Sequence, residues 1–386
     1  MRDPLSKKIT GIAPSGIRKF FDIVSEMDNV ISLGVGEPDF DTPWAIRDEG
    51  IYSLERGRTF YTSNSGLKEL RTEIAAYIRR RLGVNYNPVS EVLVTVGGSE
   101  GIDLAFRAMI NPGDEVLIPE PSYVSYKPCA ILADAVPVVI PLKEKNQFRL
   151  TAEEVEAAVT PKTKILVLPF PNNPTGAVMT RADLEAVAKV CIEHDLYVLS
   201  DEIYSELTYT GEDHCSIIQI PGMKERTILI NGFSKAYAMT GWRLGYLCAP
   251  EPLARQMLKI HQYAIMCAPT TSQLAAVEAL RNGDEDIASM TEEYNRRRRY
   301  IYNGLRSIGI ESFEPEGAFY IYPDIRRFGL RSDTFCERLL YENRCAIIPG
   351  SAFGDGGEGF ARISYAYSVK HITQALERIE AFVRKL

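Results

Sequence analysis

The chain has 386 residues, of which 45% are hydrophobic and 25% are charged, and its formal net charge is −7 at pH 7. This length exceeds that of most single domains, so we expect two domains, or one large domain with an appendage. The acidic balance argues against a nucleic-acid surface or an anionic membrane partner, and no apolar stretch approaches the ~20 residues of a membrane span.

Short apolar, β-rich runs alternate with helical patterns through the middle of the chain. Strands are expected at 91–96, 114–120, 135–142, 163–170, 196–202 and 226–232. Helices are expected between them at 101–110, 151–159 and 180–194. The helix at 151–159 opens with a threonine that can cap its first turn. Continuous apolar strands between helices are typical of a mostly parallel sheet that is covered on both faces.

The pattern changes near residue 286. Residues 290–309 predict a long amphipathic helix, and we interpret its basic run, Arg296–Arg299, as a solvated face. Short strands are expected at 317–323 and 360–367, followed by a final helix that runs to Leu386. This mixture predicts a second domain of the α+β type.

Disulfide, metal and dinucleotide sites are all disfavoured by residue spacing. The seven cysteines form no CxxC pair, and the N-terminus lacks the apolar core of a signal peptide, so we expect reduced thiols in a cytoplasmic protein. The four histidines show no ligand spacing, and we expect no metal. The stretch 354–359 fits G-x-G-x-x-G, but it neither follows a strand nor opens a helix, so we interpret it as a turn.

Polar or aromatic residues follow five of the predicted strands. In open α/β sheets, ligands collect at the carboxyl ends of the strands. Each ending alone has an ordinary explanation, such as a tight turn, a helix cap, a core tyrosine or a solvated lysine. One shared ligand is more probable than five independent coincidences. The endings are Gly97-Gly98-Ser99-Glu100, Glu120-Pro121-Ser122-Tyr123, Pro171–Gly176, Asp201–Tyr204 and Ser234-Lys235.

A ligand with a phosphate, a flat aromatic ring and a carbonyl fits these endings, and pyridoxal 5′-phosphate (PLP) is such a ligand. A lysine at a strand end can bond its aldehyde, and an aspartate can keep its pyridine nitrogen protonated as an electron sink. An aromatic side chain can stack on the ring. An arginine and a helix N-terminus can hold the phosphate.

Several motifs occur in order along nearly the whole chain: SLGVGEPDFDTP (32–43), YTSNSGLKELR (61–71), VGGSEGID (96–103), PFPNNPTG (169–176), SDEIYSEL (200–207), GFSKAYAMTGWRLGY (232–246), GAFYIYP (317–323) and ARISYA (361–366). With these motifs the chain resembles the class I/II PLP-dependent aminotransferases of fold type I. It is most similar to bacterial members that include aspartate, aromatic and N-acetyl-diaminopimelate aminotransferases.

The resemblance implies an α/β fold with a mostly parallel seven-stranded sheet flanked by helices. The large PLP-binding domain would span 44–285, and a smaller α+β domain with an N-terminal lid segment would comprise 1–43 and 286–386. The implied activity is a ping-pong transfer of an amino group between an acidic or aromatic L-amino acid and a 2-oxo acid. The implied assembly is a homodimer with shared active sites.

The resemblance also assigns roles to individual residues. Lys235 would bond the cofactor and move the substrate proton, Asp201 would pair with the pyridine nitrogen, and Tyr204 would donate to the ring oxygen. The other implied cofactor-binding residues are Gly98, Ser99, Glu100, Tyr123, Asn173, Ser234, Arg243 and, from the neighbouring subunit, Tyr61. The implied substrate-binding residues are Gly36, Asn173 and Arg362.

Some alternatives stay open at this stage. The same scaffold also hosts β-lyases of sulfur amino acids, which would use Lys235 as well, whereas a silent regulator would need a preceding DNA-binding segment. Two positions depart from the family pattern. Gly232 stands where a phosphate-binding serine is frequent, and Ser99 stands where some aspartate-specific relatives place a lysine. Arg18 is a candidate for binding an acidic side chain, against the plainer interpretation of a solvated lid residue.

Overall fold

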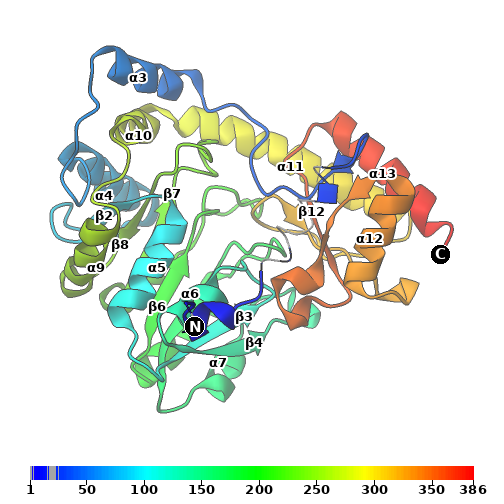
Figure 1. Cartoon of the computed structure of the whole chain (residues 1–386), viewed down its shortest axis with the longest axis horizontal. Helices are drawn as coiled ribbons and strands as arrows, with labels where there is room; N and C mark the ends of the chain where they lie inside the picture. Colours follow the sequence, from blue (N-terminus) through cyan, green and yellow to red (C-terminus); the bar gives the residue numbers. More distant parts are fainter. Residues whose placement is uncertain (1, 3, 15, 17–22, 25) are drawn as a thin grey trace.

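The structure is a computed structural model that describes residues 2, 4–14, 16, 23–24 and 26–386. Across these residues, no helix is both long enough and apolar enough to cross a membrane. The chain forms a broad sheet with helices on both faces and, beside it, two small sheets packed against three helices (Figure 1).

Seven strands form the large sheet in the order β2-β8-β7-β6-β5-β3-β4. Only β8 runs antiparallel to its neighbours in this sheet, so the predicted mostly parallel α/β arrangement is confirmed. The prediction missed β8 itself. The strands are β2 (Val92–Thr95), β3 (Glu115–Glu120), β4 (Val136–Pro141), β5 (Thr163–Leu168), β6 (Tyr197–Asp201), β7 (Thr227–Gly232) and β8 (Gly245–Cys248).

Both faces of the large sheet are buried because successive strand residues point to opposite sides. In β5, Ile165 and Val167 pack into the cluster with α5, α6 and α9, whereas Leu166 and Leu168 pack with α7 and α8. The helices are α3 (Trp44–Glu55), α4 (Lys68–Leu82), α5 (Gly98–Met109), α6 (Tyr126–Leu132), α7 (Ala152–Ala158), α8 (Arg181–Glu193), α9 (Glu251–Ala264) and α10 (Thr270–Asn282).

Local sequence signals set several helix starts. The hydroxyl of Thr151 accepts a hydrogen bond from the Glu154 amide, and the Glu154 side chain bonds back to the Thr151 amide. This reciprocal pair confirms the predicted threonine cap of α7 and satisfies two backbone donors that a helix start otherwise leaves free. Thr180 and Asp183 form the same arrangement at the start of α8.

Beside the large sheet, a further hydrophobic cluster joins the elements from residue 284 onward to the short β1. We call it the second cluster. Here β11 (Ile348–Pro349), β12 (Ala361–Ser364) and β9 (Tyr320–Ile321) form an antiparallel sheet, and β1 (Ile31–Ser32) pairs with β10 (Cys345–Ala346). The helices are α11 (Asp284–Ser307), α12 (Ser332–Asn343) and α13 (Val369–Val383). The predicted mixture of helices and short strands in this part of the chain is confirmed. The domain boundaries at 43/44 and 285/286 stay a prediction.

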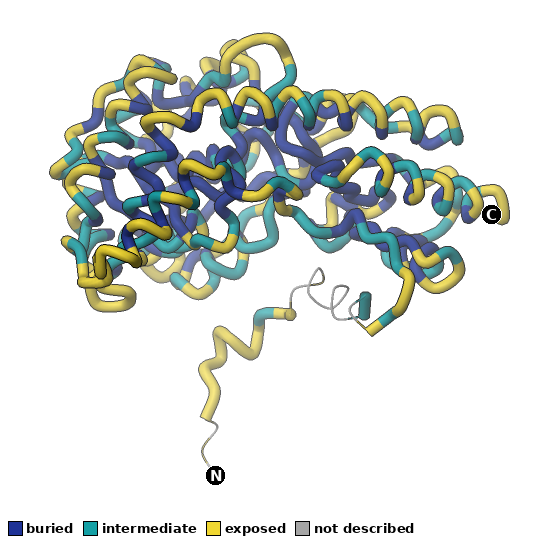
Figure 2. The backbone as a smooth tube through the Cα atoms, turned by 90° about the horizontal axis from the view of Figure 1, so that it is seen from above, coloured by how far each residue is buried: buried dark blue, intermediate teal, exposed yellow. Residues whose placement is uncertain are grey.

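Buried residues fill the middle of the molecule, and exposed residues line its outer helix turns and the N-terminal segment (Figure 2). Helix α1 (Lys7–Thr10) belongs to that segment. The Lys8 Nζ donates to the Asp134 carboxylate at 2.6 Å and thereby ties α1 to the loop after α6. Both side chains are more than one third exposed, so this pair contributes little to stability.

Candidate active site

A cavity of about 520 Å³ opens where the parallel strands end. Its wall also includes residues of β9, β12 and the loop after β1, so it lies between the large sheet and the second cluster. Most of the residues predicted for the site line it: Gly36, Gly98, Ser99, Tyr123, Asn173, Asp201, Tyr204, Ser234, Lys235, Arg243 and Arg362. The convergence expected from the strand endings is therefore present in the structure.

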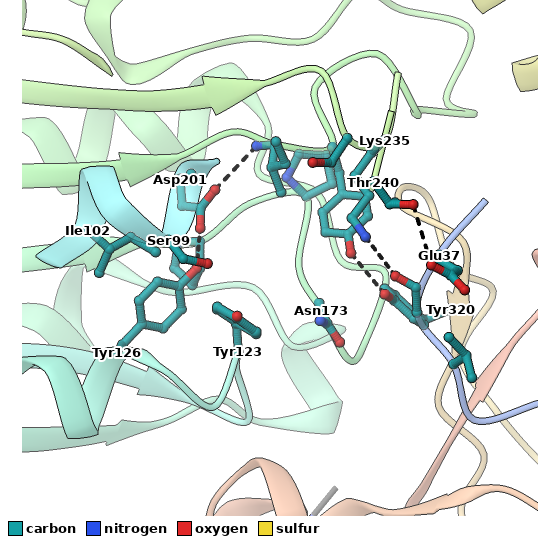
Figure 3. A pocket seen from close by; sticks show the side chains of 18 of the residues that line it. Glu37, Ser99, Ile102, Tyr123, Tyr126, Asn173, Asp201, Lys235, Thr240 and Tyr320 are labelled. Carbon is teal, nitrogen blue, oxygen red and sulfur yellow. Dashed lines mark hydrogen bonds between the residues drawn. The ribbon is translucent and has the colours of Figure 1, made fainter. Parts of the chain in front are cut away.

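Lys235 lies just after β7, and its amine points into the cavity (Figure 3). Nζ donates to the Gly36 carbonyl oxygen at 2.6 Å, and the rings of Tyr204 and Phe319 lie 5.8 and 5.6 Å from it. Burial lowers the pKa of Lys235 to about 8. An amine with this pKa is about one tenth neutral at pH 7, and the neutral amine is the form that attacks an aldehyde.

Asp201 is the last residue of β6 and is 8% exposed. Its carboxylate accepts hydrogen bonds from the Tyr126 hydroxyl at 2.7 Å and from the Ile203 amide at 3.3 Å (Figure 3). Burial raises the pKa of Asp201 to about 6 in the protein alone. A cationic N–H placed against this carboxylate would favour its ionised form, so the site suits a protonated ring nitrogen.

The start of α5 and the Arg243 guanidinium lie together in an arrangement that suits an anion. The first backbone N–H groups of α5, from Gly98 onward, have no partner within the helix. Gly97 has φ +77°, and a Cβ there would lie 2.5 Å from a terminal nitrogen of Arg243, so this glycine lets the guanidinium reach the helix start. Arg243 donates to the Thr240 carbonyl at 3.0 Å but has no acidic partner among the described residues. A phosphate would provide one.

The antiparallel strand β8 explains why a glycine replaces the frequent serine at position 232. A Cβ on Gly232 would lie 2.9 Å from the Gly245 Cα and 3.0 Å from the Leu244 carbonyl oxygen. No side chain fits there without movement of the β8 backbone. Ser234, which is 8% exposed, lines the cavity two residues later.

Arg362 lies on β12 and is 3% exposed. One terminal nitrogen donates to the Asn173 side-chain oxygen at 3.0 Å and the other to the Gly34 carbonyl. The guanidinium carbon lies 4.6 Å from the centre of the Tyr320 ring. Burial lowers the pKa of Arg362, and no acidic side chain among the described residues pairs with it. A buried guanidinium that only neutral oxygens balance is suited to a substrate carboxylate.

Two predicted aromatic residues form further walls of the cavity. Tyr204 is buried, and its hydroxyl lies 2.8 Å from the hydroxyl of Tyr320. Tyr123 meets Tyr126 edge to face, with ring centres 5.7 Å apart. These contacts hold both rings on the cavity wall. The donor role of Tyr204 and the stacking role of Tyr123 stay predictions.

Three residues named from the sequence do not line the described cavity. The Glu100 carboxylate accepts from the Val96 amide at 2.5 Å and lies 2.6 Å from His261 Nδ1, so it faces away from the cavity. Tyr61 is 82% exposed in the single chain. Arg18 lies outside the described residues.

The sequence prediction missed several residues that line the cavity, including Tyr126, Tyr320, Glu37 and Thr240. Tyr126 follows Tyr123 by three residues, a spacing that could have indicated a shared site. Glu37 and Tyr320 lie inside quoted motifs but had no individual role. Thr240 approaches the Glu37 carboxylate at 3.4 Å, a contact between residues 203 positions apart that no local pattern predicts.

The residues present fit PLP on the observations above. Three features meet at one cavity: an arginine with no acidic partner among the described residues beside the start of α5, the buried carboxylate of Asp201, and the Lys235 amine with its lowered pKa. Phosphate, ring nitrogen and aldehyde are the groups of PLP that would meet these three features.

Residues 28–379 match the family model described as aminotransferase class I and II. An aspartate aminotransferase of Pyrococcus abyssi is 44% identical, over 99% of this chain and 98% of its own. Aromatic-amino-acid aminotransferase 2 of Thermococcus litoralis is 43% identical, also over 99% and 98%. The crystal structure of an aromatic aminotransferase from Pyrococcus horikoshii is 43% identical and superposes with a TM-score of 0.91, covering 95% of this chain and 99% of that one.

Proposed function

The chain belongs to the class I and II aminotransferases and is a PLP-dependent enzyme, and on this premise we propose that it has a broad range of amino donors. The donors would be aromatic or large neutral amino acids as well as acidic ones, and the acceptor would be 2-oxoglutarate. Relatives at similar identity are named aspartate and aromatic aminotransferases, which agrees with a broad range without deciding it.

One observation carries the proposed breadth. Three cationic side chains line the described cavity: Lys235, Arg243 and Arg362. In our assignment each has a function that every substrate requires, namely bonding the cofactor, holding its phosphate and holding the substrate α-carboxylate. Ser99 stands where some aspartate-specific relatives place a lysine, so no cation of the described cavity is left to demand a second carboxylate.

In this assignment, the bound PLP withdraws electrons from the substrate Cα and so acidifies its proton. Lys235, with its neutral Nζ, would hold and move that proton. Asp201 would keep the ring nitrogen protonated, and the hydroxyl of Tyr126 holds the Asp201 carboxylate in place. Arg362 and Asn173 orient the α-carboxylate so that the Cα proton faces Lys235.

A donor panel tests the proposed range. With 2-oxoglutarate as acceptor, we expect kcat/KM for phenylalanine and tyrosine to lie within about a hundredfold, or ~3 kcal/mol, of the values for aspartate and glutamate. The measurement is initial rates for the four donors at equal enzyme concentration. An aspartate preference of about three orders of magnitude, roughly 4 kcal/mol, would instead require a dedicated cation outside the described cavity.

The proposal includes a homodimer whose subunits share their active sites. Phe60, Tyr61 and Tyr263 are 81%, 82% and 86% exposed, and such exposure of aromatic rings favours a covered surface. Thr270 donates to the Phe60 carbonyl at 2.6 Å and Asn64 to the Met266 carbonyl at 2.9 Å, so these aromatic residues lie on adjoining segments. A second copy of the chain is the occupant that the resemblance at Tyr61 suggests.

Hybrid dimers test the shared site. Tyr61→Phe should weaken cofactor binding, because a phosphate contact across the interface is lost, and Lys235→Ala should remove the covalent bond. Unfolding and refolding the two variants together should yield hybrids with one doubly altered site and one intact site. We expect sites of wild-type cofactor affinity to appear only after mixing. A monomer at micromolar concentration in sedimentation, or no such sites after exchange, would contradict the shared site.

A further inference from the structure

Tyr320 lies on β9 at the wall of the cavity. It contacts one residue assigned to the cofactor, Tyr204, and one assigned to the substrate, Arg362. Its hydroxyl lies 2.8 Å from the hydroxyl of Tyr204, and the Arg362 guanidinium carbon lies 4.6 Å from its ring centre. Tyr320 is 1% exposed, and Figure 3 shows it among the side chains that line the cavity. The mechanism above gives it no role, although it touches both the residue assigned to the cofactor ring oxygen and the residue assigned to the substrate carboxylate.

Counting protons decides which hydroxyl donates when the cofactor is bound. A phenol has one proton to donate, and in the protein alone either Tyr204 or Tyr320 can donate to the other. In the proposed function, Tyr204 donates its proton to the cofactor ring oxygen. The bond between the two tyrosines then needs the proton of Tyr320.

We propose that Tyr320 is a positioning residue that donates its hydroxyl proton to Tyr204. This inference rests on the proposed function of Tyr204. Donation into the Tyr204 oxygen polarises its O–H group, and hydrogen bonds in such a chain strengthen one another. Tyr204 therefore binds the ring oxygen more strongly than it would alone.

The structure holds the Tyr320 hydroxyl in one place. The Tyr320 backbone pairs with Ser364 on β12, and the ring is fixed against Arg362. A Cβ on Gly36 would lie 2.3 Å from the Tyr320 oxygen, so the glycine leaves just enough space for the hydroxyl to reach Tyr204. Both the reach and the direction of the donor are therefore set by packing.

The expected consequence is a change in how the bound cofactor titrates. In the holoenzyme, the ring oxygen would share a proton with the Lys235 nitrogen, and the oxygen would carry its full negative charge once that proton left. Donors to the oxygen stabilise this charged form and so lower the pH at which the proton is lost. Removing the Tyr320 hydroxyl should raise that pH.

The experiment is a pH titration of the visible absorbance of the holoenzyme. Tyr320→Phe keeps the ring that packs on Arg362 and removes only the hydroxyl. We expect its titration midpoint to rise by about 0.5 to 1 pH unit, a three- to tenfold change that matches the loss of one hydrogen bond. KM for the amino donor should stay at the wild-type value, and kcat should fall.

Tyr322→Phe is the matched control, because Tyr322 is equally buried and its hydroxyl faces the Gly357 carbonyl at 3.5 Å, outside the described cavity. Its midpoint should equal that of the wild type. Tyr204→Phe closes a double-mutant cycle: Tyr320→Phe should have no further effect in that background, because Tyr320 acts through Tyr204.

Two results would overturn this inference but not the proposed function. One is an unchanged titration midpoint in Tyr320→Phe. The other is an equal shift of the midpoint by Tyr320→Phe in the wild-type and Tyr204→Phe backgrounds. In both cases the absorbance band of the bound cofactor would remain, and the proposed function would stand. Absence of any such band in the wild type would instead overturn the assignment of Lys235 to the cofactor, and this inference with it.

Discussion

Replacing Lys235 by alanine is expected to abolish covalent cofactor attachment and to lower kcat by at least about 10⁴-fold, the upper range for loss of a general base. The methyl group can neither bond the aldehyde nor move the Cα proton. The visible absorbance of the bound cofactor should change, and borohydride should fix no cofactor to the variant, as measured by the mass of the denatured chain.

The fold should survive this substitution. Burial lowers the pKa of Lys235 from 10.5 to about 8, so the folded state binds the proton less tightly than the unfolded state. This difference costs stability below pH 8 and disappears above pH 10.5, so alanine at pH 7 should leave the melting temperature of the apoprotein unchanged or higher. Lys189→Ala is the control, because Lys189 is 75% exposed on α8. A cofactor still fixed by borohydride in Lys235→Ala would refute the assignment.

Asp201→Asn is expected to lower kcat by about 10²- to 10⁴-fold, or ~3–5 kcal/mol, while PLP still binds. The amide keeps the shape of the side chain but removes the charge that holds the ring nitrogen protonated. Without that proton the ring withdraws electrons less strongly, so removal of the substrate Cα proton becomes the affected step. A larger isotope effect with Cα-deuterated donor would identify this step.

Stability should respond in the opposite sense to activity. Burial raises the pKa of Asp201 to about 6, so its ionised form costs folding free energy above pH 6, and the cost vanishes below the unfolded value of 3.8. Asp201→Asn apoprotein should therefore be no less stable than the wild type at pH 7. The neighbouring Glu202→Gln serves as control: its carboxylate bonds Ser200, Ser216 and His214 on the other side of the loop. Full turnover by Asp201→Asn with bound PLP would contradict the role of Asp201.

The sequence determined most of the central sheet and the polar residues at its edge. Continuous apolar strands bury both faces, and their endings collect at one edge, so Asp201 and Lys235 could be placed together without coordinates. The short strand β8 could not be found this way, because its four residues overlap the end of the motif around Arg243 and a run of four residues is a weak signal. The glycine at position 232 acquires its reason only from the contact with Gly245 on that strand.

Contacts between distant segments were decided by the tertiary structure alone. Tyr320 meets Tyr204 across 116 residues, and Lys235 meets the Gly36 carbonyl across 199. The same packing turns the Glu100 side chain toward His261, although Ser99 and Ile102 on the same helix line the cavity. Sequence periodicity indicates which face of a helix or strand is buried, because the spacing of apolar residues within the element places them on one face. It does not report which side chain from another element lies opposite, because that depends on how the whole sheet and the second cluster pack together.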